Sequence, residues 1–226
     1  ARRVEDIIAF GNGHPQSEFT TQESVSNVDL NDIHEYYKTY FRPNNAYLII
    51  LGDVDADEVI SISENLFGDW KNSSNLNNLF GDSSINSFKE ASSSNNISIH
   101  VVDVPNSSNV EVTFQNIITR TLKDENYFSS NIANRVLGAR PESRLESVIR
   151  EDNGYAYYAR SILSSNSDTK TKIQARTTVR DEVTDSAVVE IYNQLKKIGE
   201  VPITDEELEN AKSGYFGSFA MSMENS

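Results

Sequence analysis

Hydrophobic residues recur at helical spacing in the first part of the chain and predict three helices. The first covers residues 1–10 and ends at Gly11. A second helix follows Asp29 and a third follows Asp55, because aspartate suits the N-cap position. Between these two helices, the continuous apolar run 46–51 has the length of a buried strand. This part of the chain therefore predicts helices and a strand in alternation.

The segment 71–96 differs from both of its neighbours in composition. It is rich in Asn and Ser and has few apolar residues, so we interpret it as a linker between two halves. A long surface loop within one domain is the alternative. The linker interpretation makes residues 1–70 the C-terminal part of a first α/β half. It makes residues 97–226 a second α/β half that is truncated at its C-terminus.

The pattern after the linker predicts an α+β fold. Alternation of apolar and polar residues predicts strands at 97–101, 110–114 and 172–179. Helical spacing predicts helices at 124–137, after Thr184 and after Thr204. The last of these opens with Thr204-Asp205-Glu206-Glu207, the pattern of a capping box. We expect an antiparallel-rich sheet with helices packed on one face.

The stretch 143–158, SRLESVIREDNGYAYY, joins a helix to a strand. Leu145, Val148 and Ile149 have the i, i+3, i+4 spacing of a buried helical stripe. Gly154 lies where a helix C-cap favours a residue that tolerates positive φ. The aromatic residues that follow predict a strand that begins at Tyr155.

Arg150 and Tyr157 are the candidate site residues of this stretch. Arg150 lies in the last turn of the predicted helix and Tyr157 on the predicted strand, so both reach one edge of the sheet. There a guanidinium and a phenol can donate hydrogen bonds to a peptide carbonyl or its tetrahedral oxyanion. In the alternative, Arg150 pairs with Glu146, Glu151 or the helix C-terminus, and Tyr157 lies in the core. The residues alone leave both interpretations open.

Charge and composition exclude several classes of function. The chain has 20 Lys and Arg against 34 Asp and Glu, a net charge of −14. Such a surface disfavours nucleic acid and anionic membranes, although it fits a basic or neutral peptide and also simply aids solubility. The absence of cysteine excludes disulfides, thiolate zinc ligands and thiol catalysis. No apolar run is long enough to span a membrane.

The sequence predicts no metal site within this chain. A zinc peptidase needs two histidines one helical turn apart together with a glutamate. His14, His34 and His100 are far apart in the sequence, and neither HExxH nor HxxEH occurs. The G-x-S-x-G nucleophile elbow and a phosphate-binding glycine loop are also absent.

Several stretches together point to one family of proteins. They are His14-Pro15, Glu18-Phe19-Thr20-Thr21, the run IHEYYKTYFRPNNAYLIILGDVD at 33–55, Leu137-Gly138, Ser143-Arg144-Leu145, Ile149-Arg150-Glu151, Gly154-Tyr155-Ala156-Tyr157, and the helix with Leu208, Ala211 and Lys212. In this combination the chain resembles the insulinase/pitrilysin-type zinc peptidases, the inverzincins with the HxxEH signature. The resemblance covers most of the chain.

The resemblance implies two homologous half-domains of the LuxS/MPP-like metalloprotease fold that enclose a chamber. In active members of the family, the first half holds zinc, and the second half contributes an Arg and a Tyr seven residues apart that hold the substrate. Those positions match Arg150 and Tyr157. We therefore expect zinc in an intact parent protein and none bound by this chain. We also expect the zinc-binding segment to lie upstream of Ala1.

Two hypotheses of function follow from the resemblance. The first is a fragment of a zinc metalloendopeptidase that contributes the substrate-clamping half of the active site but lacks the metal site. The alternative is a non-catalytic peptidase-like domain that binds peptides or serves as a structural partner. The expected partners are a peptide or unfolded polypeptide and a homologous peptidase half or subunit. A periplasmic or exported location is expected from the family alone.

Overall fold

The computed structural model describes residues 2–71, 97–165 and 171–224. The chain divides into two compact units. Unit 1 combines Ala1–Ser17 with Lys89–Ser226, and unit 2 is Glu18–Phe88. The segment interpreted as a linker falls almost entirely outside the described residues. The halves at 1–70 and 97–226 therefore stay a prediction.

Unit 1 is built on a three-stranded antiparallel sheet. Its strands are β1 (Asn109–Ile118), β2 (Ala159–Leu163) and β3 (Thr171–Arg180), in the order β1-β3-β2. Thr177 in the central strand lies opposite Val112 on one side and Ala159 on the other. All three residues are buried, as the alternation along β3 predicts for one face of the sheet. The predicted α+β fold is confirmed.

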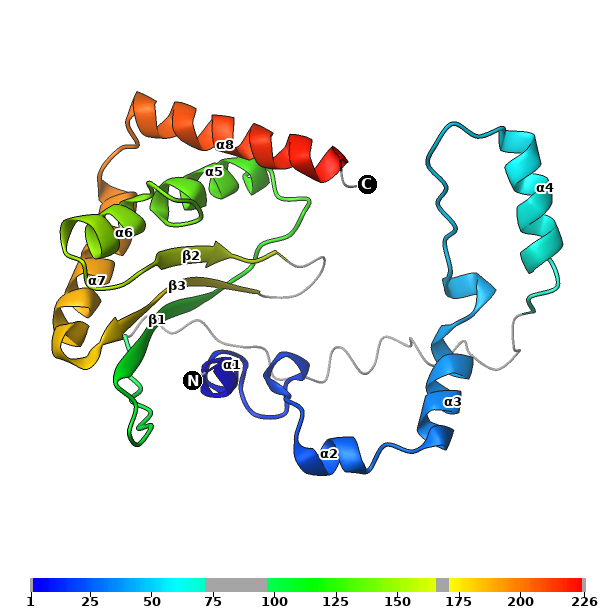
Figure 1. Cartoon of the computed structure of the whole chain (residues 1–226), viewed down its shortest axis with the longest axis horizontal. Helices are drawn as coiled ribbons and strands as arrows, with labels where there is room; N and C mark the ends of the chain where they lie inside the picture. Colours follow the sequence, from blue (N-terminus) through cyan, green and yellow to red (C-terminus); the bar gives the residue numbers. More distant parts are fainter. Residues whose placement is uncertain (1, 72–96, 166–170, 225–226) are drawn as a thin grey trace. The chain divides into compact units, whose positions relative to one another are not determined.

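Helices cover the apolar face of the sheet in unit 1 (Figure 1). They are α5 (Tyr127–Leu137), α6 (Arg144–Glu146), the π-helix η4 (Ser147–Asp152) and α7 (Thr184–Glu200), while α8 (Asp205–Glu224) packs on α5. The core between sheet and helices consists of Val112, Leu137, Leu145, Ile149, Ala159, Ala175, Val179, Ala187 and Ile191. Among the described residues, no helix is both long and apolar enough to cross a membrane.

The first helix, α1 (Arg2–Phe10), lies against the polar face of the same sheet. The Glu5 carboxylate accepts a hydrogen bond from the Thr113 hydroxyl at 3.0 Å, and the Glu5 carbonyl accepts one from the Gln115 amide at 3.0 Å. Thr113 and Gln115 alternate along β1 with residues that face the core. The short 3-10 turn η1 (Pro15–Ser17) follows α1. The helices that follow residue 97 therefore lie on one face of the sheet, as expected, and α1 lies on the other face.

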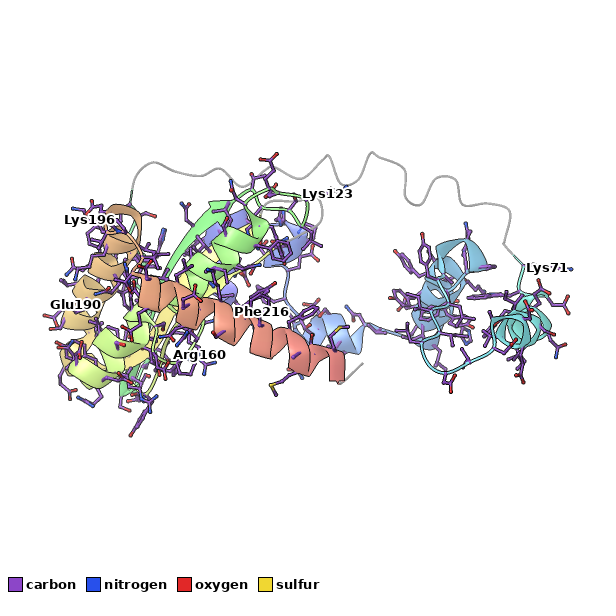
Figure 2. All side chains as sticks on the ribbon, turned by 90° about the horizontal axis from the view of Figure 1, so that it is seen from above. Lys71, Lys123, Arg160, Glu190, Lys196 and Phe216 are labelled. Carbon is purple, nitrogen blue, oxygen red and sulfur yellow. The ribbon has the colours of Figure 1, made fainter. Side chains whose placement is uncertain are left out.

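Unit 2 contains helices but no buried core in its described part. Its elements are α2 (Gln22–Ser26), α3 (Leu30–Tyr40), the 3-10 turn η2 (Pro43–Asn45) and α4 (Ala56–Phe67). Asp29 and Asp55 cap α3 and α4 as predicted, each through backbone N–H groups of the first turn. None of the residues 18–71 with described side chains is buried, and Figure 2 shows side chains projecting outward from α3 and α4.

Two of the predicted strands are not formed. Residues 46–51 and 97–101 are neither helix nor strand, and their apolar side chains are exposed, with Ile49 at 78% and Ile99 at 86%. A β-strand forms only where a neighbouring strand supplies backbone hydrogen-bond donors and acceptors. The apolar pattern indicates surface that favours burial, but it does not supply that neighbour. The predictions of strands here were wrong for this reason.

The helix predicted at 124–137 begins three residues late, at Tyr127. Asp124, the expected cap, instead accepts a hydrogen bond from the backbone N–H of Thr121 at 2.8 Å. Its carboxylate therefore closes a turn before the helix.

Candidate functional site

The junction between η4 and β2 places Arg150 in the last helical turn. Two apolar side chains anchor this turn on the sheet, because Leu145 is 1% exposed and Ile149 is fully buried. Gly154 adopts a φ of +63°, as predicted for the C-cap region. Its N–H donates to the Arg150 carbonyl at 3.1 Å, and the Tyr155 N–H donates to the Ile149 carbonyl at 2.9 Å. Two backbone hydrogen bonds therefore fix the turn that carries Arg150.

The strand after this junction begins at Ala159, four residues later than the predicted start at Tyr155. Just before this start, side chains form hydrogen bonds with the backbone N–H of Ala159 and the backbone carbonyl of Tyr158. The Glu146 carboxylate accepts from the Ala159 N–H at 2.9 Å, and the Thr177 hydroxyl donates to the Tyr158 carbonyl at 2.6 Å. Tyr157 consequently lies on a connection rather than on a strand.

Arg150 is both paired and accessible. Its Nη1 donates to Glu146 Oε1 at 3.0 Å, which is one of the pairings that the sequence left open. The Arg150 side chain is 55% exposed, whereas that of Glu146 is only 9% exposed. Within the described residues, no further contact of the guanidinium is seen. Its Nε and Nη2 therefore have no partner among the described residues and can donate to a ligand.

Tyr157 is 95% exposed, so the interpretation of this residue as core is wrong. In the described part of the chain, its hydroxyl contacts no other side chain. The phenol and the guanidinium therefore present hydrogen-bond donors from the same junction between helix and strand. The site roles of Arg150 and Tyr157 stay a prediction.

The structure adds two groups at this junction that the sequence did not single out as site residues. Glu146 appeared only as one possible partner of Arg150, from its i, i+4 spacing. The second group is the Gly138 carbonyl, which accepts from the Ser161 N–H at 3.0 Å. A Cβ at Gly138 would lie 2.5 Å from the Ser161 nitrogen, so only glycine allows this approach. The outer N–H groups of Ala159 and Ser161 on β2 are thus already occupied.

An ion pair fixes the helix that carries the site to α8. Arg144 Nε donates to Glu207 Oε1 at 2.6 Å, and Arg144 Nη2 donates to Glu207 Oε2 at 2.8 Å. The predicted capping box is also formed, because the Thr204 N–H donates to Glu207 Oε2 at 2.9 Å. The hydrogen bond from Arg144 is the main reason that the pKa of Glu207 falls from 4.5 to about 2. The same hydrogen bond raises the pKa of Arg144.

Two surface hollows flank this ion pair. Glu142 and Glu207 line both of them, the first together with Arg135 and Arg140 and the second together with Lys197 and other residues. Neither hollow is lined by Arg150 or Tyr157. We place the candidate site at the junction because Glu146 engages only Nη1 of Arg150, whereas Glu207 engages both Nε and Nη2 of Arg144.

Across 2–71, 97–165 and 171–224, no three His, Asp or Glu side chains gather as a metal ion requires. His14 Nδ1 accepts from the Gln16 N–H at 3.1 Å, and His100 Nε2 lies 3.1 Å from the Ser98 hydroxyl. The residues of the described chain therefore do not fit the zinc site of the resembled peptidases. We therefore assign no zinc-dependent chemistry to these residues.

Comparison with known proteins identifies one family and several similar folds. Residues 27–215 match the family model described as the peptidase M16 inactive domain. No protein of curated function matches the chain.

Among solved structures, a peptidase M16 inactive domain from Pseudomonas fluorescens is 17% identical with a TM-score of 0.78, covering 96% of this chain and 50% of that one. A protease from Helicobacter pylori is 19% identical with a TM-score of 0.71, and the match covers 92% of this chain and 49% of that one. The periplasmic protease PqqL from Escherichia coli is 16% identical with a TM-score of 0.74, and the match covers 97% of this chain and 23% of that one. At these identities the likeness shows the fold alone. The chain spans at most about half the length of these structures.

Proposed function

The chain belongs to the peptidase M16 inactive-domain family, and we propose that it is a non-catalytic half of an M16-type protein that binds peptide or unfolded polypeptide. The family membership confirms the resemblance to pitrilysin-type peptidases. One observation carries the proposal of peptide binding: Arg150 and Tyr157 present accessible hydrogen-bond donors from one helix-to-strand junction.

These two donors suit the backbone of an extended peptide. Such a peptide offers a carbonyl every 3.3 Å or so, and its carbonyls accept readily from guanidinium and phenol groups. Hydrogen bonds from a charged donor such as Arg150 are stronger than neutral ones. The net charge of −14 further favours neutral or basic peptides over acidic ones. In this proposal, recognition through backbone carbonyls does not require a strict side-chain sequence in the peptide.

The exposed apolar surface of unit 2 supports a partner of the same family. Ile33, Tyr37 and Leu48 are each more than half exposed, and they belong to a unit without buried residues in its described part. Extensive exposed apolar surface on a folded protein marks an interface. In the proposal, a homologous half covers this surface.

A second candidate function is the substrate-clamping half of a zinc metalloendopeptidase. The similarity of fold to structures described as proteases, from Helicobacter pylori and Escherichia coli, favours it. In this version the homologous half holds the zinc, and Arg150 and Tyr157 hold the substrate beside it. The described residues of this chain supply no ligand to the metal.

Peptide binding tests the proposal. A fluorescently labelled, permanently unfolded polypeptide is titrated with the full-length protein, and anisotropy gives the Kd. We expect Arg150→Ala to weaken binding about 5- to 20-fold and Tyr157→Phe about 3- to 10-fold. Each variant removes a hydrogen bond, worth about 1–1.8 kcal/mol for the charged donor and about 0.6–1.4 kcal/mol for the neutral one.

Two variants serve as matched controls. Arg3 is exposed on α1, which lies on the opposite face of the sheet from η4, so Arg3→Ala removes an exposed arginine away from the junction. Tyr192→Phe removes a partly exposed hydroxyl from α7. The proposal fails if the wild type does not bind, or if the site and control variants lose affinity equally.

A further inference from the structure

Glu146 is a nearly buried carboxylate that binds both ends of the junction. Its side chain is 9% exposed. Oε1 accepts from Arg150 Nη1 at 3.0 Å, and Oε2 accepts from the N–H of Ala159, the first residue of β2, at 2.9 Å. The segment between Arg150 and Ala159 contains Tyr157. One side chain therefore links the end of the helix to the start of the strand across the candidate site.

The burial of this carboxylate limits how Arg150 can move. A buried charge is costly unless it is paired and hydrogen-bonded. In the part of the chain that the structure describes, Arg150 is the one cation that pairs with Glu146. Releasing Arg150 would leave a buried anion with only a backbone N–H, so the guanidinium is held in place. Its Nε and Nη2 donate to no described residue, and the side chain as a whole is 55% exposed.

A donor held in its binding position loses less conformational entropy when a ligand arrives. Ordering a long, flexible side chain during binding costs conformational entropy. An arginine that is already held by Glu146 has lost much of this freedom in the unbound protein. Its remaining hydrogen bonds therefore contribute more of their free energy to affinity.

From this geometry we propose that Glu146 is the positioning residue of the peptide-binding site. It fixes Arg150 against the start of β2, so that the free guanidinium donors and the Tyr157 hydroxyl engage the same peptide. The inference rests on the proposed function and extends it to a residue that does not itself contact the peptide. Glu146 acts through Arg150, and this dependence separates it from a residue that only stabilises the fold.

A double-mutant cycle measures that dependence. The anisotropy titration is repeated with Glu146→Gln, Arg150→Ala and the double variant. Glutamine keeps an oxygen that can accept from the Ala159 N–H but lacks the charge that holds Arg150. We expect Glu146→Gln to weaken binding about 3- to 10-fold alone and less than about 2-fold when Arg150 is already alanine.

The controls address folding and location. Glu142→Gln changes a carboxylate that is 75% exposed and pairs with Arg140 before the helix, and we expect it to bind as the wild type does. Near-UV circular dichroism gives the folded fraction of each variant, and the titrations are corrected for it. If Glu146→Gln does not fold, the double-mutant cycle is repeated with Glu146→Asp. The shorter aspartate keeps the charge but cannot reach both Arg150 and the Ala159 N–H.

The outcomes separate the two proposals. If Glu146→Gln binds as the wild type does, or if its effect is equal with and without Arg150, Glu146 is not a positioning residue, while the proposed function stands. If Arg150→Ala itself binds as the wild type does, the proposed function fails and the inference fails with it. A loss of affinity that disappears in the double variant supports both.

Discussion

Replacing Glu207 with glutamine removes the ion pair that ties the site-bearing helix to α8. Arg144 then donates to one neutral amide oxygen in place of the two carboxylate oxygens that it contacts at 2.6 and 2.8 Å. Because the pKa of Glu207 in the folded protein is lowered to about 2, its ionised form stabilises the fold. This stability is fully present above the unfolded pKa of 4.5. It is lost as the pH falls through 4.5 towards 2.

The size of the effect follows from the two pKa values. One pKa unit corresponds to about 1.4 kcal/mol, so a drop from 4.5 to about 2 sets an upper bound of about 3 kcal/mol. The side chains of Arg144 and Glu207 are 15% and 29% exposed, and water screens part of their attraction. We therefore expect Glu207→Gln to lower the free energy of unfolding by about 1–2 kcal/mol at pH 7.

Urea denaturation of both proteins between pH 7 and pH 2.5 tests this expectation. The difference in unfolding free energy should stay constant from pH 7 to about 5.5 and shrink steadily below pH 5. Glu209→Gln is the control, because Glu209 pairs with Lys212 at 2.8 Å on the exposed surface of the same helix. It should cost less than about 0.5 kcal/mol. An equal cost of Glu207→Gln at pH 7 and pH 3 would refute the reasoning.

Two further predictions concern the packing around the site. Gly138→Ala should lower the free energy of unfolding by about 1–3 kcal/mol, because its Cβ would lie 2.5 Å from the Ser161 nitrogen. The control Gly199→Ala in α7 should be neutral or stabilising, because a Cβ there meets no neighbouring atom within 4 Å. Equal urea midpoints of the two variants would contradict this prediction. Arg120 is 5% exposed and donates to Asn131 Oδ1 at 2.7 Å and to three other acceptors. Arg120→Met should cost about 2–4 kcal/mol in the same assay, and a loss below about 1 kcal/mol would mean that these bonds contribute little.

Features with a local cause could be predicted from the sequence. Asp29 and Asp55 cap their helices, and Thr204 forms its capping box, because each contact lies within one helical turn. The positive φ of Gly154 has the same local origin. Strand β3 was predictable because its alternating residues are buried on one face of the sheet. The α+β fold follows from these elements.

Features that depend on distant residues were not predictable. The run 46–51 has the composition of a strand but lacks the neighbouring strand that would make it one in the described residues. Arg144 and Glu207 are 63 positions apart, so no spacing rule reveals their ion pair. The role of Glu146 at the site depends on Ala159, which approaches it only because β2 folds back onto the helix. Arg150 and Tyr157 were visible as candidate donors, and Glu146 was visible only as one possible partner of Arg150.

Hydrogen exchange of the full-length protein, with and without a saturating unfolded polypeptide, tests the central claim most directly. If the junction between η4 and β2 binds the peptide, backbone N–H groups in residues 150–158 exchange more slowly in the complex. The protection should weaken in Arg150→Ala at the same polypeptide concentration. Protection elsewhere with unchanged exchange at residues 150–158 would contradict the assignment of this junction as the peptide-binding site.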